Sequence, residues 1–370
     1  MEKAHLIKLM HRALELASQS TPFPNPYVGC LILKNGSIIG EGSHQKAGEP
    51  HAEINCLNAC TESAEGATMI INLEPCFHYG RTPPCVDRII SSGIKKVIVA
   101  TKDPNPKTNG KSLQKLKDAG IEVVCGIAEE RAKDLNAPFF KWITTGLPYV
   151  SLKAAISLDG KIATVAHDSR WISSEQSRLW AHRFRNSIDG ILVGASTVRE
   201  DDPQLSARTE KVYYPTRIVL SESGDIPTGA RIFSLPGKTV IAVPEGLKKE
   251  LQESFQGKAE VLLCRRDQTG IDIGDLLRRL GQKSITHLLV EGGSKVFTAF
   301  IEGGHVDAFY FIVAPKLLGE GISLMRGTTL EISNAICLEF QDVQRSGPDL
   351  IITAHYKKEK LEAEGYKRIV

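Results

Sequence analysis

The sequence predicts an α/β protein of two domains, and three observations support this. The chain has 370 residues, which exceeds the length of one ordinary domain. Short apolar runs with strand character alternate with stretches of helical periodicity, which is typical of sheets flanked by helices. A second series of such runs begins after the linker Leu147-Pro148. We therefore expect domains over residues 1–146 and 147–370.

The composition is that of a protein that buries sizeable cores. Apolar residues make up 42% of the chain and charged residues 24%, and no apolar run is long enough to cross a bilayer. The formal net charge of +3 gives no reason to expect a nucleic-acid surface. Eight cysteines without an N-terminal signal peptide favour a reducing cytosol. We expect a cytoplasmic protein that binds neither membranes nor nucleic acids.

The first domain should begin with an amphipathic helix over residues 2–18, because apolar residues from Leu6 to Ala17 recur at helical spacing. The pair Asn35-Gly36 is a strong signal for a hairpin turn. The predicted strands cover residues 28–33, 37–39, 69–73, 96–100 and 121–125. The other predicted helices start at residue 51 and cover residues 86–90 and 112–119.

His51, Cys76 and Cys85 are the residue types of a catalytic zinc site, in which three protein ligands leave one coordination position open. Glu53 offers a carboxylate that can move protons at that position. On an ideal helix, residues i and i+2, such as His51 and Glu53, point in directions that differ by roughly 200°. In the first turn of a helix, however, both side chains can face an ion above the helix end. His51 and Glu53 therefore predict a helix start. A helix start at Cys85 would also favour its thiolate.

Two other interpretations of these residues are a structural zinc site and a set of buried thiols. A structural site needs a fourth ligand, for which His78 is the nearest candidate, and it has no use for Glu53. We therefore favour the catalytic interpretation. The remaining cysteines are expected to be packed core thiols: Cys30, Cys56, Cys60, Cys125, Cys264 and Cys337.

The spacing of the thiols departs from the H-x-E and P-C-x-x-C signature of zinc deaminases, because eight residues separate Cys76 from Cys85. With this insert, which ends in Gly-Arg-Thr-Pro-Pro-Cys, and with the motifs at residues 24–29, 44–53 and 103–106, the sequence resembles the bacterial bifunctional riboflavin-biosynthesis deaminase/reductase family over nearly the whole chain. The resemblance implies a cytidine-deaminase-like α/β/α first domain and a homo-oligomer.

The same resemblance implies a set of substrate-binding loop residues in the first domain. His44 and Arg81 are expected to meet a phosphate or ribose, and the other members are expected to hold the remainder of the substrate. From composition alone, turn formation explains these loop residues equally well. The implied set is Asn25, His44, Arg81, Asp103 and Asn105.

The second domain is predicted to be another α/β domain. A helix should start after a cap at Ser173 or Ser174 and run to about Asn186. The charged run Lys357–Glu362 should be solvated. The predicted strands cover residues 150–157, 191–193, 217–220, 239–243, 261–263, 288–290, 309–313 and 351–354.

Two segments of this domain, Ile191–Thr197 and Leu288–Ser294, each end a strand on glycine before a helix. Backbone N–H groups at such turns can approach a phosphate. Neither segment is a G-x-G-x-x-G fingerprint, and packing alone explains single turns of this kind better.

Residues 152–163, 169–173, 197–203 and 291–293 resemble the reductase half of the same family, which implies a dihydrofolate-reductase-like fold and NADPH. The implied cofactor-binding residues are Ala155, Trp171, Thr197, Asp201, Ser221, Gly293, Ser294, Lys295, Val296, Phe297, Thr298 and Ala299. The implied substrate-binding residues are Lys153, Ser169, Arg185, Leu205, Arg208 and Glu291. A guanidinium presents a planar fork of donors, which makes Arg185 and Arg208 suitable phosphate partners.

The resemblance implies two reactions on one pathway. Zinc and Glu53 would remove the 2-amino group of 2,5-diamino-6-(5-phosphoribosylamino)pyrimidin-4(3H)-one by hydrolysis. NADPH would then reduce the ribosyl chain of 5-amino-6-(5-phosphoribosylamino)uracil to ribityl. The alternatives are a nucleoside or nucleic-acid deaminase with an unrelated second domain, and a non-enzymatic zinc-stabilised binding protein.

Overall fold

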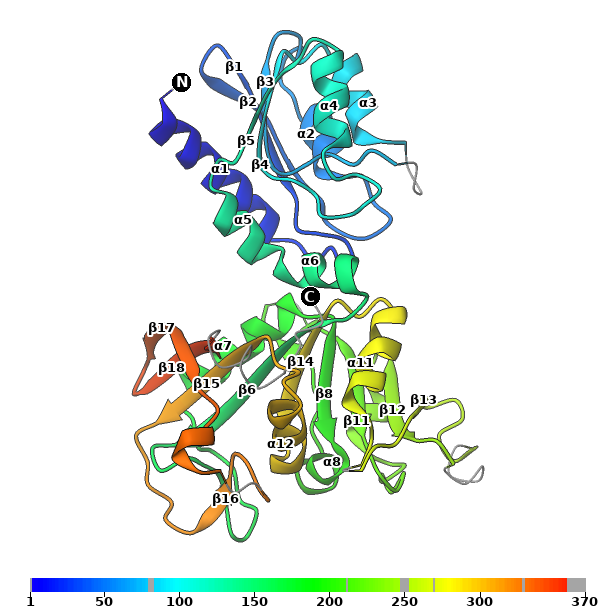
Figure 1. Ribbon diagram of the computed structural model, residues 1–370, viewed down its shortest axis with the longest axis vertical. Coiled ribbons are helices and arrows are strands. Elements are labelled where there is room, and N and C mark those ends of the chain that lie inside the picture. Colours follow the sequence, from blue (N-terminus) through cyan, green and yellow to red (C-terminus); the bar gives the residue numbers. More distant parts are fainter. Residues whose placement is uncertain are drawn as a thin grey trace. The chain divides into compact units, whose positions relative to one another are not determined.

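The chain divides into two compact units, Met1–Thr145 and Gly146–Val370, against a predicted boundary after Gly146 (Figure 1). The computed structural model describes residues 2–78, 83–210, 212–246, 253–268, 270–327 and 330–357. Arg81 and the part of the charged run after Lys357 lie outside the described residues.

The first unit is built on a five-stranded sheet with the strand order β2-β1-β3-β4-β5. β1 is antiparallel to β2 and β3, and β3, β4 and β5 are parallel to one another. All five predicted strands are present, and positive φ angles of 51° and 86° at Asn35 and Gly36 form the predicted hairpin turn. The strands are β1 Gly29–Lys34, β2 Ser37–Ser43, β3 Thr68–Leu73, β4 Lys96–Thr101 and β5 Glu122–Cys125.

Helices cover both faces of this sheet because side chains alternate along its buried strands (Figure 1). In β1, Cys30 and Ile32 face the core under α2, α3 and α4, while Leu31 and Leu33 face the core under α1 and α5. This is the expected α/β/α arrangement. The helices are α1 Lys3–Ser18, α2 Ala52–Asn58, α3 Cys85–Ser91, α4 Lys111–Asp118, α5 Glu129–Leu135 and α6 Ala137–Thr145.

The second unit contains a nine-stranded sheet with the order β13-β12-β11-β8-β14-β6-β15-β18-β17. The strands from β13 to β15 are parallel, and β18 and β17 continue the sheet in antiparallel pairing. The strands are β6 Tyr149–Ser157, β8 Gly190–Gly194, β11 Thr216–Leu220, β12 Thr239–Pro244, β13 Glu260–Cys264, β14 His287–Gly292, β15 Ala308–Ala314, β17 Leu338–Ser346 and β18 Asp349–Tyr356.

Short strands and helices complete the second unit. The helices α11 and α12 pack on one face of the sheet, and α8 and α9 pack on the other. The side chain of Ser174 caps α7 by accepting the N–H of Ser177 at 3.3 Å, as predicted. The further elements are α7 Glu175–Phe184, η1 Arg185–Ser187, α8 Ala195–Asp201, α9 Arg231–Ser234, α11 Ile273–Gln282, α12 Ser294–Glu302, η2 Ile332–Asn334, and the strand pairs β7 Lys161–Thr164 with β16 Gly321–Ser323 and β9 Ala207–Arg208 with β10 Val212–Tyr213.

Two sequence predictions need correction. Cys125 is exposed at the end of β5 and is not a core thiol, because the strand ends at the rim of the sheet. The edge strand β17 was absent from the predicted strands. Its side chains are almost all exposed, so it lacks the buried apolar run that marked the other strands.

Candidate active sites

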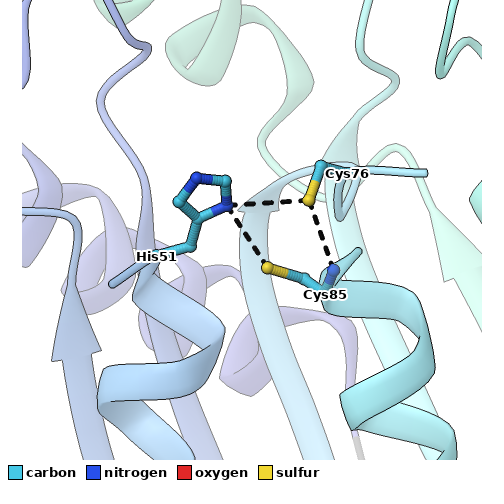
Figure 2. A group of neighbouring side chains, drawn as sticks. All are labelled: His51, Cys76 and Cys85. Carbon is cyan, nitrogen blue, oxygen red and sulfur yellow. Dashed lines mark hydrogen bonds between the residues drawn. The ribbon is translucent and has the colours of Figure 1, made fainter. Parts of the chain in front are cut away.

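The three predicted metal ligands lie at the starts of two helices and in the loop after a strand. His51 is the N-cap residue of α2, Cys85 is the first residue of α3, and Cys76 follows β3 (Figure 2). The Nδ1 atom of His51 lies 3.6 Å from Sγ of Cys76 and 3.3 Å from Sγ of Cys85. All three donor atoms lie within 4.8 Å of one another. The fold therefore joins the predicted donors into one site.

These separations fit a zinc ion. With Zn–S bonds of about 2.3 Å and Zn–N bonds of about 2.0 Å, tetrahedral angles place the nitrogen and sulfur atoms about 3.5 Å apart. Within the described residues, no fourth His, Cys, Asp or Glu joins this group. His78, the candidate for a structural fourth ligand, lies beside the Thr108 hydroxyl at 3.4 Å instead. The donor set is thus of the catalytic type, with three protein ligands.

Hydrogen bonds prepare one thiol of the site for metal binding. Cys85 and His51 lower the pKa of the Cys76 thiol to about 4, and the backbone N–H of Cys85 also donates to Cys76 Sγ at 3.3 Å. The hydrogen-bonding interaction with the Cys76 sulfur, followed by burial, raises the pKa of Cys85, and two adjacent thiolates would also repel each other. A divalent cation between the two sulfurs would remove this repulsion and favour both thiolates.

Glu53 lies in the first turn of α2, is only 3% exposed and lies close enough to the Cys85 thiol for each group to shift the pKa of the other. Burial raises the pKa of Glu53 to about 7, whereas a bound cation would lower it. A carboxyl group with a pKa near neutrality can both accept and return a proton. The helix start therefore brings a carboxyl group that can carry protons next to the metal ligands.

His44 and Asn25 form a hydrogen-bonded pair beside the metal ligands. The rings of His44 and His51 lie 5.2 Å apart. Nδ1 of His44 lies 3.1 Å from the Pro50 carbonyl and must donate to it, so Nε2 accepts the Asn25 amide at 2.9 Å. Burial also lowers the pKa of His44. His44 is therefore a neutral side chain that orients Asn25, and its contact with substrate stays a prediction.

The loop after β4 carries Asp103 and Asn105. Oδ1 of Asp103 accepts the backbone N–H of Asn105 at 2.9 Å, and burial raises the pKa of Asp103 to about 6. The Glu74 carboxylate holds this loop by accepting the backbone N–H groups of Asp103 at 3.2 Å and Gly110 at 2.8 Å. Sequence reasoning missed Glu74, although an acidic residue directly before Pro-Cys was a usable signal.

Two buried asparagines hold the loop that carries Asn25. Asn72 accepts the N–H of Gly29 and donates to the Tyr27 carbonyl, and Asn136 accepts the N–H of Tyr27. Sequence reasoning missed both residues as well. Asn72 is a fully buried amide inside an apolar strand. An asparagine in the middle of an apolar run is the sequence signal that indicates a structural hydrogen bond there.

The second unit contains a cavity of about 1100 Å³. All six predicted substrate-binding residues line it. Of the twelve predicted cofactor-binding residues, only Thr298 does not. Its hydroxyl instead donates to the Ser294 carbonyl and accepts the backbone N–H of Arg326, which itself lines the cavity. The predicted residues that do line the cavity are Lys153, Ala155, Ser169, Trp171, Arg185, Thr197, Asp201, Leu205, Arg208, Ser221, Glu291, Gly293, Ser294, Lys295, Val296, Phe297 and Ala299.

A buried carboxylate with two cations lines this cavity. Glu291 accepts two hydrogen bonds from the Arg185 guanidinium, at 3.0 and 2.5 Å, and Nζ of Lys153 lies 3.7 Å away. Burial alone would raise the pKa of Glu291, but Arg185 and Lys153 lower it to about 2. Burial lowers the pKa of Lys153. Glu291 is therefore ionised at neutral pH and orients both cations.

The two predicted glycine turns both reach the cavity. Gly194 precedes α8 at the end of β8, and Gly293, with a φ angle of 84°, precedes α12 at the end of β14. A Cβ atom at Gly293 would lie 3.5 Å from the Thr197 hydroxyl, so the two turns are neighbours. Adjacent turns at the carboxyl ends of parallel strands are a usual dinucleotide site.

Comparisons with known proteins identify the family of each unit. Residues 148–352 match the family described as RibD C-terminal domain, and residues 3–101 match the cytidine and deoxycytidylate deaminase zinc-binding region. The riboflavin biosynthesis protein RibD of Aquifex aeolicus is 41% identical over 93% of this chain and 96% of its own length. The corresponding protein of Escherichia coli is 37% identical over 93% of this chain and 97% of its own.

Solved structures show the same two-domain fold. The deaminase/reductase from Thermotoga maritima superposes with a TM-score of 0.86 at 35% identity, covering 96% of this chain and 99% of its own. A structure of Acinetobacter baumannii RibD gives a TM-score of 0.87 at 36% identity, covering 96% of this chain and 100% of its own.

A zinc deaminase domain joined to a reductase domain defines a bifunctional enzyme, and the cofactors of this class are zinc and NADPH. The chain belongs to the RibD family of riboflavin biosynthesis and carries both its deaminase and its reductase domain. Its substrate is a small molecule. Across the described residues, no helix has the length and apolar character needed to span a membrane.

Proposed function

We propose that this chain catalyses two consecutive reactions of riboflavin biosynthesis on phosphoribosyl-aminopyrimidines. The first is hydrolytic deamination of 2,5-diamino-6-(5-phosphoribosylamino)pyrimidin-4(3H)-one, and the second is NADPH-dependent reduction of the ribosyl chain of 5-amino-6-(5-phosphoribosylamino)uracil. The observation that carries the proposal is the three-donor set of His51, Cys76 and Cys85 with the buried Glu53 beside it. The Thermotoga maritima relative is named for both of these activities.

In the deaminase site, His51, Cys76 and Cys85 hold zinc and Glu53 moves protons. Zinc, when bound, supplies a Lewis acid that lowers the pKa of water toward neutrality. The Glu53 carboxylate takes one proton from the attacking water and passes it to the ring nitrogen, and then passes the second proton of that water to the leaving amine, so that a carbonyl forms and ammonia departs. Asn25, His44, Asp103 and Asn105 hold the substrate, together with Arg81, which lies outside the described residues.

In the reductase site, the chain positions the cofactor against the substrate. NADPH, when bound, supplies the hydride. The glycine turns before α8 and α12 bind its phosphates through backbone N–H groups. Lys153, Arg185 and Glu291 orient the ribosyl part of the substrate, and the buried ammonium of Lys153 can give a proton to the sugar oxygen as the carbon is reduced.

The proposal includes a cytoplasmic homo-oligomer. All eight cysteines are free thiols, which suits a reducing compartment. The edge strand β17 exposes Phe340 by 67% and Val343 by 52%. An exposed edge strand with apolar side chains is a common place for a second copy to bind.

A coupled assay tests the two activities together. The purified chain is supplied with the diaminopyrimidine ribotide, zinc and NADPH, and ammonia and NADPH are followed in the same sample. We expect one NADPH to be consumed for each ammonia released. Release of ammonia with no NADPH consumption would indicate a deaminase with an unrelated second domain, and the absence of both would contradict the proposed function.

A further inference from the structure

Two arginines of the reductase cavity have opposite surroundings. Arg185 makes a two-pronged ion pair with Glu291 and also donates to the Ser206 carbonyl at 3.0 Å. Its side chain is only 13% exposed. Because a buried carboxylate already neutralises this guanidinium, a substrate phosphate could bind Arg185 only by competing with Glu291.

Arg208 is held by neutral acceptors instead. Its Nη1 donates to Oε1 of Gln204 at 2.9 Å, and its Nη2 lies 3.0 Å from Nε2 of His182. In the part of the chain that the structure describes, no carboxylate forms an ion pair with Arg208, which is exposed and lines the cavity. Its positive charge is therefore fixed in direction but not neutralised, which suits it to bind an anion.

His182 must be neutral to play this part, and its surroundings keep it so. It lies in the last turn of α7 and faces Arg185 of η1, Arg208 of β9, Glu291 of β14 and the Ser206 carbonyl. Burial, followed by the two guanidinium groups, lowers the pKa of His182 to about 4. A neutral ring has one acceptor nitrogen, but both ring nitrogens face Arg208: Nε2 lies 3.0 Å from its Nη2, and Nδ1 lies 3.4 Å from its backbone nitrogen. Because a guanidinium can only donate and its contact is the shorter one, we assign Nε2 as the acceptor and Nδ1 as the nitrogen that carries the proton, toward the Ser206 carbonyl.

We propose that His182 is a positioning residue of the reductase site, which together with Gln204 aims Arg208 at the phosphate monoester of the substrate. Arg185, in contrast, forms the ion pair with Glu291. This inference rests on the proposed function, because it assumes a substrate that carries a phosphate. It assigns different tasks to two arginines that look equivalent in the sequence.

The test uses the full chain, four single variants and the double variant of His182→Leu with Arg208→Met. His182→Leu removes the acceptor, His182→Gln keeps one, Gln204→Leu removes the second acceptor, and Arg208→Met removes the anchor itself. Reductase kinetics are measured with 5-amino-6-(5-phosphoribosylamino)uracil and with its dephosphorylated analogue. Binding of ribose 5-phosphate is measured by calorimetry, which needs no turnover. Deaminase activity and the Kd for NADPH report on the fold of each variant.

We expect His182→Leu to raise KM for the phosphorylated substrate about tenfold, as for the loss of one hydrogen bond to a charged group, with a much smaller change in kcat. His182→Gln should recover most of the loss, and Gln204→Leu should act in the same direction as His182→Leu. With Arg208→Met already present, His182→Leu should add no further rise. The dephosphorylated analogue should not distinguish wild type from His182→Leu.

An equal rise in KM for both substrates, or additive effects with Arg208→Met, would overturn the assignment of His182. If the wild-type chain reduces neither substrate, the proposed function fails, and ribose 5-phosphate binding then decides the inference separately. Weaker binding in His182→Leu than in wild type would support it, and equal binding would refute it.

Discussion

At the residue scale, the deaminase centre depends on an acidic side chain that a helix start places next to metal ligands. Glu53 is buried, interacts with Cys85 and has a pKa raised to about 7 by burial. A group in this setting can change its protonation state during a reaction at neutral pH. Substitution of a metal ligand should remove the metal, whereas substitution of Glu53 should leave the metal bound.

Glu53→Gln should keep zinc and lose deamination. The amide has nearly the same shape, but it cannot accept the proton of water, so we expect the rate of ammonia release to fall by about 10²–10⁴-fold. Zinc content measured by metal analysis should remain at one ion per chain. Normal ammonia release by this variant would remove Glu53 as the proton carrier.

Cys85→Ser should lose zinc together with deamination. A hydroxyl is a much poorer zinc ligand than a thiolate, and only two strong donors, His51 and Cys76, would remain. The matched control is Cys125→Ser, because Cys125 is an exposed cysteine that does not belong to the group of metal ligands. A normal zinc content in Cys85→Ser would refute the ligand assignment.

At the element scale, the position of α2 depends on its close packing against β2. A Cβ atom at Gly42 of β2 would lie 2.3 Å from the backbone nitrogen of Cys56 and 2.8 Å from the carbonyl of Ala52. Only glycine allows the helix to approach the strand this closely. Because α2 carries Glu53 and follows His51, this contact also sets the geometry of the metal centre.

Gly42→Ala should therefore destabilise the first unit and weaken its zinc site. Overpacking of this kind costs about 1–3 kcal/mol. The measurements are the midpoint of thermal unfolding and zinc affinity in competition with a chelator. Gly229→Ala is the control substitution, because a Cβ atom there meets nothing within 4 Å. Equal midpoints and zinc affinities for the two variants would contradict the packing argument.

At the scale of the whole molecule, the two sites lie in separate compact units. The metal ligands belong to Met1–Thr145, and every residue that lines the large cavity belongs to Gly146–Val370. Each unit has its own sheet and its own cores on both faces. The two chemistries should therefore be separable.

Removal of zinc should inactivate only the first unit. After treatment with a chelator, we expect ammonia release to stop, while reduction of supplied 5-amino-6-(5-phosphoribosylamino)uracil and the Kd for NADPH stay unchanged. NADPH binding can be followed by quenching of tryptophan fluorescence, because Trp171 lines the cavity. Loss of both activities in the chelated protein, restored together by zinc, would show that the sites are not independent.

Much of this molecule was predictable because the information is local. The residue types alone indicate the chemistry of the imidazole, the thiols and the carboxylate. The helix starts at His51 and Cys85 follow from short-range spacing. Strand runs with buried side chains on both faces were also recognisable, whereas the exposed β17 was not. The cofactor stretch is predicted as a continuous run, so it includes Thr298, which does not line the cavity.

Residue types and their spacing are enough to identify the possible zinc donors, the Glu53 that accompanies them and a second α/β domain. Which side chains become partners depends on the tertiary structure. Cys85 and His51 come together across 34 positions, and Arg185 and Glu291 across 106. Such pairings depend on strand order and helix packing, and no local pattern encodes them. For the same physical reason, only the fold distinguishes the neutralised Arg185 from the Arg208 that His182 and Gln204 hold.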